Sequence, residues 1–225
     1  MNRKGFLTAA LIIVMVTAGV SAQQRGGAVE TTNLTEVIAG LPLEDLNEAE
    51  IEGLLLMREE EKLARDVYLT LADEWNIRSF TNISRSEETH MDAVAQILDR
   101  YGIDDPVPSD SIGAFTNPLF VQLYEELVQS GMESYLDALK VGAKIEELDI
   151  ADLLNLMDSA DNEDILVVYQ NLLKGSRNHL RSFDMQIARF GGTYSPEHLS
   201  ATEYERIATS RRETGAAITD PGYSF

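Results

Sequence analysis

The sequence has 225 residues, of which 38 are acidic and 18 are basic, so its formal net charge is −20. A chain this acidic is not expected to bind the phosphate backbone of nucleic acids. It has no cysteine, which excludes disulfides, thiolate metal sites and cysteine nucleophiles and leaves oxygen and imidazole groups for any chemistry. Length and composition predict one folded globular domain.

The first 22 residues have the pattern of a secretory signal peptide. Arg3 and Lys4 precede an apolar run over 5–20, and the small residues at 20–22 match a signal-peptidase site. We therefore expect cleavage after Ala22 and a secreted or periplasmic protein without a stable membrane span. An uncleaved N-terminal anchor is the alternative, but the apolar run is short for a span of about 20 residues.

Helical spacing of apolar residues dominates the rest of the chain. After a flexible lead-in over 23–45, the sequence predicts four long helices, at 48–76, 82–102, 132–158 and 162–190. A short helix at 118–129 is expected in the long connection between the second and third of them. The tail, 191–225, is expected to hold a short helix that begins at Ser200. This all-α pattern favours an antiparallel four-helix bundle over 46–190.

Each long helix carries a carboxylate or an imidazole on the face that its apolar residues define. In chain order these residues are Glu60, the Glu-x-x-His pair Glu87 and His90, then Glu146, then His179. Glu61 and Glu147 lie nearer the edge of that face on a helical wheel and are second choices. Burying unpaired carboxylates is costly, so a shared metal ion is the simplest partner for the four helices.

The same residues also have purely structural interpretations. Ser84-x-x-Glu87 matches a capping box, and His179 could be a hydrogen-bonded core histidine. Glu60 and Glu146 could instead form ion pairs at a partly hydrated edge of the bundle. Their candidate partners are Arg58, Arg65 and Lys144. His198, in the tail, is expected at the surface. The metal interpretation depends on the coincidence of two histidines and three glutamates on four successive helices.

The order of these residues resembles the ferritin-like fold. In that fold two helices each supply a Glu, and two others supply Glu-x-x-His, to a pair of iron or manganese ions. Four stretches also resemble an uncharacterised prokaryotic family grouped with ferritin-like proteins, the domain of unknown function 2202: REEEKLARDVYLTLADEW, FTNISRSEETHMDAVAQILDRYGIDDP, VGAKIEELDIADL and NLLKGSRNHLRSF. The resemblance covers about residues 46–190 and implies a bundle with a metal site, but the family has no settled activity.

Two departures from the ferritin-like pattern affect the expected ligands. Ser176 occupies the place of the glutamate in the second Glu-x-x-His, so the six-ligand set is incomplete. The pattern E-x-x-x-R-x-x-Y of rubrerythrin-like relatives matches Glu61, Arg65 and Tyr68, whereas the helical wheel favours Glu60. The remaining five groups could hold one ion, an asymmetric pair, or none.

Two classes of function are consistent with these features. The first is an exported protein with one or two iron or manganese ions, with zinc as a competitor, and with oxidase or peroxidase chemistry; Ser176 and Asn178 would then be hydrogen-bond donors to the ligands. The second is a non-catalytic helical interaction module with a degenerate metal site, whose acidic surface and 102–117 loop meet a protein partner. Iron storage in a ferritin-type cage is a third interpretation, which nothing in the sequence favours. The sequence leaves homo-oligomerisation, substrate and partner open.

Overall fold

The computed structural model describes residues 31–225, so the predicted signal peptide at 1–22 lies outside the described residues. The described part is all-α and contains no strand; its helices are α1 (Thr31–Gly40), α2 (Glu48–Trp75), α3 (Arg78–Tyr101), α4 (Pro118–Gly131), α5 (Tyr135–Met157), α6 (Glu163–Arg189) and α7 (Ala201–Thr209). Within residues 31–225 no helix combines the length and the apolar character needed to cross a bilayer.

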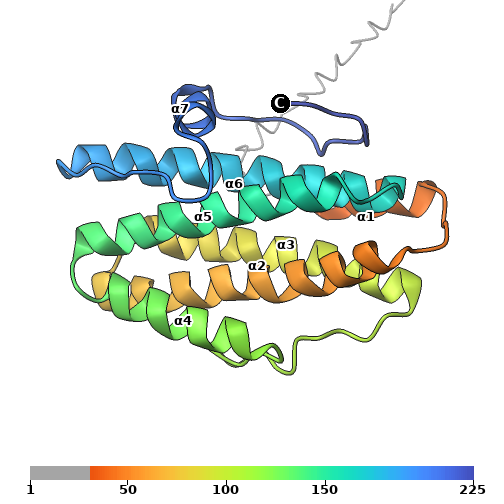
Figure 1. Cartoon of the computed structure of the whole chain (residues 1–225), viewed down its shortest axis with the longest axis horizontal. Helices are drawn as coiled ribbons and strands as arrows, with labels where there is room; N and C mark the ends of the chain where they lie inside the picture. Colours follow the sequence, from red (N-terminus) through yellow and green to blue (C-terminus); the bar gives the residue numbers. More distant parts are fainter. Residues whose placement is uncertain (1–30) are drawn as a thin grey trace, which may run out of the picture.

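The four long helices α2, α3, α5 and α6 lie side by side (Figure 1). α2 packs against α3 and α5 against α6, and further contacts join α2 to α5 and α3 to α6. Helix α4 covers the outer side of α2 and α5, α1 contacts α3 and α6, and α7 contacts α6. Buried apolar side chains from all four long helices form one core. Side chains on the inward faces of these helices therefore meet in a shared interior.

Local sequence signals account for the helix ends. Asn47 and Glu50 form a capping box at the start of α2, and Glu50 also accepts a backbone hydrogen bond from Asn162 at the start of α6, 3.0 Å away. Gly102 ends α3 with φ +67°, in the left-handed region that glycine adopts without strain. Ser200 caps α7, as the sequence predicts. These caps fix the lengths of the helices that carry the candidate site.

Two segments differ from expectation. Residues 31–40, within the expected flexible lead-in, form α1, and its Leu34 and Ile38 are buried against the long helices because they lie one turn apart on one face. Helix α3 begins at Arg78 rather than at 82, since the chain turns back directly after α2. The other long helices have bounds close to the predicted ones.

The 102–117 connection is fastened to the middle of α2. Lys62 donates to the backbone carbonyl of Ser111 at 2.8 Å, and the backbone N–H of Thr116 donates to Glu59 at 2.5 Å. The middle of α2 is therefore covered on this side as well, and every residue in it is buried. Helix α2 has no single inward face in this region.

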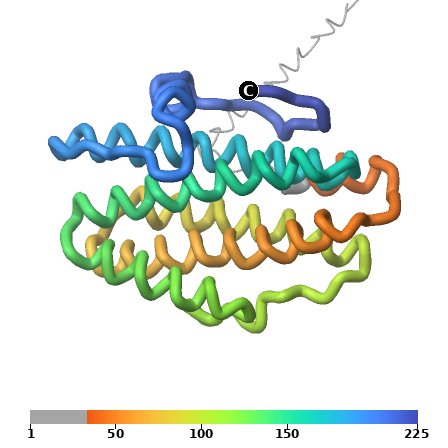
Figure 2. Tube along the Cα trace, viewed as in Figure 1, coloured from red at the N-terminus to blue at the C-terminus, as the bar shows by residue number. Residues whose placement is uncertain are grey.

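The segment after α7 runs back along α6 (Figure 2). Arg177 and Arg181 of α6 form ion pairs with Glu213 at 2.6 and 3.0 Å. Burial alone would raise the pKa of Glu213, but the two guanidinium groups lower it overall. The ring of Phe225 lies against Arg177, with 4.4 Å between the guanidinium carbon and the ring centre. The C-terminal segment is thus part of the folded domain.

Candidate metal centre

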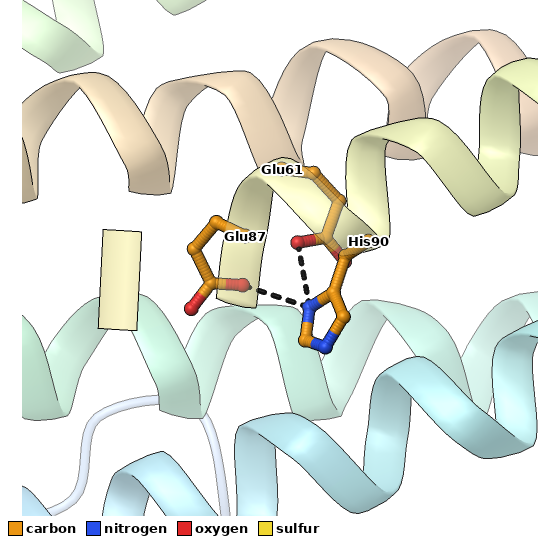
Figure 3. A group of neighbouring side chains, drawn as sticks. All are labelled: Glu61, Glu87 and His90. Atoms are coloured by element: carbon orange, nitrogen blue, oxygen red, sulfur yellow. Dashed lines mark hydrogen bonds and ion pairs between the residues drawn. The ribbon is translucent and has the colours of Figure 1, made fainter. Parts of the chain in front are cut away.

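Glu61 of α2 lies against Glu87 and His90 of α3 in the interior (Figure 3). His90 Nδ1 is 2.8 Å from Glu87 Oε2 and 3.2 Å from Glu61 Oε2. Glu87 and His90 share one face because they are about one helical turn apart, and the packing of α2 on α3 brings Glu61 opposite them. All three side chains are buried, and one ligand atom from each lies within 4.8 Å of the other two.

A second group shares Glu87 with the first. His179 Nδ1 of α6 is 2.9 Å from Glu87 Oε1 and 3.4 Å from Glu146 Oε2 of α5. The two oxygens of Glu87 therefore face different imidazoles. The rings of His90 and His179 have centroids 5.8 Å apart. One continuous buried cluster thus connects all four long helices.

An aromatic cluster fixes the position of Glu146. Tyr68 donates its hydroxyl hydrogen to Glu146 Oε1 at 2.5 Å, and its ring lies 5.4 Å from that of Phe80 and 5.6 Å from that of Phe183, centre to centre. Burial, followed by the charges of nearby carboxylates, raises the pKa of Tyr68 well above its usual value. Tyr68 therefore remains protonated and acts as a hydrogen-bond donor to Glu146.

Burial and mutual attraction shift the pKa of every group in the cluster. Burial raises the pKa of Glu61 to about 7. Burial would also raise the pKa of Glu87, but the imidazoles of His179 and His90 hold it below its usual value. Burial opposes the charged form of His179, yet the carboxylates of Glu87 and Glu146 raise its pKa to about 10. Without metal the imidazoles therefore hold protons, which a bound metal ion would displace.

Two buried polar atoms of the cluster have no hydrogen-bond partner among the described residues. They are Glu61 Oε1 and His90 Nε2. Such unpaired buried atoms are rare in folded proteins, and here they concentrate where carboxylate oxygens and imidazole nitrogens converge. Oxygen and nitrogen donors of this kind suit iron, manganese and zinc. The residues present therefore fit a metal ion, and both groups can hold one.

Gly175 of α6 makes room for the imidazole of His90. A Cβ atom at Gly175 would lie 2.5 Å from both Cε1 and Nε2 of the His90 ring. No other residue type leaves this space, because every other side chain begins with a Cβ. The close approach of α6 to α3 therefore holds His90 in place.

Glu61, and not Glu60, takes part in the cluster. Glu60 is buried outside both groups, and its Oε1 has no hydrogen-bond partner in the described part of the chain. Burial, and then the charges of Asp152 and Glu61, raise the pKa of Glu60. The helical wheel favoured Glu60 because it assumes one buried face. Residues 57–68 of α2 are all buried, so the centre of the apolar residues does not mark the direction of the cluster. The pattern that includes Glu61 and Tyr68 is the better guide, since Tyr68 contacts Glu146 of the second group.

The structure brings together four of the first-choice residues, Glu87, His90, Glu146 and His179, with Glu61, which was a second choice. It places Glu147 and Asn178 elsewhere. Glu147 accepts hydrogen bonds from the backbone N–H of Leu199 at 2.6 Å and from the Tyr194 hydroxyl at 2.7 Å. Asn178 forms two hydrogen bonds with the backbone of Glu213, at 3.0 and 2.9 Å. Both residues therefore hold the C-terminal segment, because they lie toward the side of their helices that this segment covers.

Sequence reasoning missed Asp149, a buried carboxylate beside the cluster. The hydroxyl of Ser176 donates to Asp149 Oδ2, while Asp149 Oδ1 has no hydrogen-bond partner within residues 31–225. Burial raises the pKa of Asp149 well above its usual value, and the charges of Glu61 and Glu60 raise it further. Asp149 belongs to neither group, but the neighbouring helix α5 thus places a carboxylate next to Ser176. The spacing Glu146-x-x-Asp149, one helical turn, is the signal that could have found it.

Some of the structural alternatives for these residues do not hold, but His179 is buried and paired with Glu87 and Glu146, as a hydrogen-bonded core histidine would be. Ser84 lies inside α3 and donates to the carbonyl of Thr81 at 3.2 Å, so Glu87 is not part of a capping box. The basic residues considered as partners pair with other acids: Arg58 with Asp105, Arg65 with Asp66 and Asp110, and Lys144 with Glu197. His198 is exposed, as predicted.

Comparison with known proteins shows the family of the chain and a solved structure of similar fold. The chain belongs to the family described as uncharacterized protein domain DUF2202, whose model matches residues 50–211. It is 54% identical over 182 residues to the uncharacterized protein MJ0754 of Methanocaldococcus jannaschii, across 81% of this chain and 98% of that protein. The crystal structure of hypothetical protein MJ0754 from Methanococcus jannaschii DSM 2661 matches with a TM-score of 0.76 and 55% identity, over 77% of this chain and 99% of that one. The family resemblance is therefore confirmed, and its description states no activity.

Proposed function

We propose that this protein is a ferritin-like metalloprotein, in which a four-helix bundle of α2, α3, α5 and α6 holds two iron or manganese ions. The observation that carries the proposal is the position of Glu87, which has one oxygen beside His90 and the other beside His179. A carboxylate placed in this way can bridge two cations. Glu61 and His90 would be the other protein ligands of one ion, and Glu146 and His179 those of the second.

The residues around this centre would support oxidase or peroxidase chemistry by orienting the ligands and limiting the access of water. Bound iron or manganese would supply electron transfer to oxygen or peroxide. The apolar core around the cluster limits the access of water, and Tyr68 orients Glu146 through its short hydrogen bond. Asp149, held by Ser176, supplies a further carboxylate close to the place where the ferritin-like pattern has a glutamate. Zinc fits the same donors and would compete for the site.

Replacing Glu87 with glutamine tests this proposal. Wild-type protein saturated with Fe²⁺ or Mn²⁺ should retain about two equivalents after desalting, as for other paired carboxylate–histidine centres. Glu87→Gln should lose most of this metal, because it removes the shared anionic ligand while keeping the shape of the side chain. Plasma mass spectrometry of the desalted protein measures both.

Glu88→Gln is the matched control, since Glu88 is the exposed neighbour of Glu87 on the same helix. This variant should keep the wild-type metal content. The proposal would be contradicted if the wild-type protein retains well below one equivalent of metal and Glu87→Gln retains the same amount. That result would support the alternative of a helical interaction module with a degenerate site.

We also propose that the protein is exported and that signal peptidase cleaves after Ala22. The support is the charged start, apolar run and small residues of the first 22 positions. Intact-mass analysis of protein expressed with its native N-terminus should then find Gln23 as the first residue in the exported fraction. A full-length chain that stays with the membrane would instead indicate an uncleaved anchor.

A further inference from the structure

A cleft of about 790 Å³ opens beside the cluster, between α3, α6 and the chain at the end of α7. His179 lines this cleft and is also a member of the second metal group. It is 9% exposed, whereas the other four residues of the two groups are at most 2% exposed. Solvent therefore reaches the cluster most directly through the cleft at His179.

The charge of the cleft is opposite to that of the whole protein. Its lining includes three arginines and, among the described residues, no acidic side chain, although the chain has a net charge of −20. Arg181 forms an ion pair with Glu213, which also pairs with Arg177. Arg85 and Arg212 are exposed, and their side chains have no ion pair or hydrogen bond within the described part of the chain. Two unpaired cations thus stand at the opening that leads to His179.

The remaining lining combines apolar and small polar groups. Ile83 of α3 and Met185 of α6 supply apolar surface, and serine hydroxyls lie near them. Ligand sites commonly combine apolar walls with a few charged groups that fix orientation. An inorganic anion would leave the apolar surface unused, whereas an organic anion would use both features.

We propose that this cleft is the entrance to the metal centre and that it binds a small organic carboxylate. The carboxylate group would meet Arg85 and Arg212, which suit planar anions through paired N–H donors. The apolar part would lie along Ile83 and Met185 and extend toward His179. This inference rests on the proposed metal centre for its functional meaning, but binding in the cleft can be measured separately.

Calorimetric titration of the mature, metal-loaded protein with hexanoate tests the binding step. Hexan-1-ol and inorganic phosphate are comparison probes, because each has only one of the two features that hexanoate combines. Arg85→Gln/Arg212→Gln should weaken hexanoate binding by about tenfold or more, since charge-assisted hydrogen bonds are lost. The matched control is Arg189→Gln/Arg211→Gln, which removes two exposed arginines outside the cleft and should leave the affinity unchanged. Hexan-1-ol or phosphate binding as tightly as hexanoate, or an affinity that is equal in the two double variants, would overturn the proposal.

Proximity to the metal centre needs a second measurement. Protein loaded with paramagnetic Mn²⁺ should broaden the proton NMR signals of bound hexanoate much more than protein loaded with Zn²⁺. Arginine-dependent binding without this broadening, in protein that holds Mn²⁺ in the cluster, would show that the cleft is not the entrance. Arginine-dependent binding to a protein that takes up no metal would contradict the proposed function and leave only an anion site. Metal content measured on each variant keeps the two failures apart, because Arg85 and Arg212 are in neither metal group.

Discussion

Removal of metal with a chelator should lower the melting temperature of the mature protein by about 5–10 °C relative to the Mn²⁺-saturated protein. A ligand that binds only the folded state, at about 100 times its dissociation constant, adds about 2.7 kcal/mol to the free energy of unfolding. The effect is expected here because metal would bond to buried donor atoms such as Glu61 Oε1, which has no hydrogen-bond partner among the described residues. Calorimetry of the two forms in one buffer gives the comparison.

Glu87→Gln provides the control for this effect. Its melting temperature should be nearly the same with Mn²⁺ and with chelator, because the ligand common to both groups is missing. A wild-type protein that melts at the same temperature with and without Mn²⁺ would show that its stability does not depend on metal at the cluster.

Gly175→Ala should both destabilise the protein and reduce its metal content. The new Cβ would overlap the ring of His90 at 2.5 Å, so the ring or helix α6 must move. Overpacking of this kind typically lowers the free energy of unfolding by about 1–3 kcal/mol. Because His90 belongs to only one of the two groups, we expect the metal content to fall from about two equivalents toward one. Chemical denaturation and metal analysis of the same preparation measure both effects.

Gly40→Ala is the matched control for this substitution. No atom lies within 4 Å of a Cβ placed at Gly40, at the end of α1. Its stability should be unchanged or higher by up to about 1 kcal/mol, because alanine favours helix over glycine. Full metal content in Gly175→Ala would mean that His90 is not a ligand, even if the protein is less stable.

The sequence was sufficient to predict the long helices because their apolar spacing and end signals agree. It also identified Glu87, His90, Glu146 and His179, which the structure brings together, since each lies on the apolar face of an amphipathic helix. Their assembly into one cluster depends on packing between helices far apart in the sequence. That packing could be expected only from the resemblance to a known fold.

The errors arose where tertiary contacts override a helical wheel. Glu60 looked central because the wheel assumes one buried face, whereas the 102–117 connection and α4 cover the remaining sides of α2. Glu147 looked like a second choice for the metal, but it binds backbone N–H groups of the C-terminal segment, whose path the sequence does not reveal. Asp149 was missed because its importance comes from Ser176 on another helix.

Anomalous diffraction from crystals of the mature protein grown with Mn²⁺ tests the central claim most directly. The account predicts two anomalous peaks in the interior, one between Glu61, Glu87 and His90 and one between Glu87, Glu146 and His179. Data collected at the manganese absorption edge would identify the ions. Anomalous peaks that lie only on the acidic surface, while Glu87 remains paired with the two imidazoles, would contradict the claim of an interior metal centre.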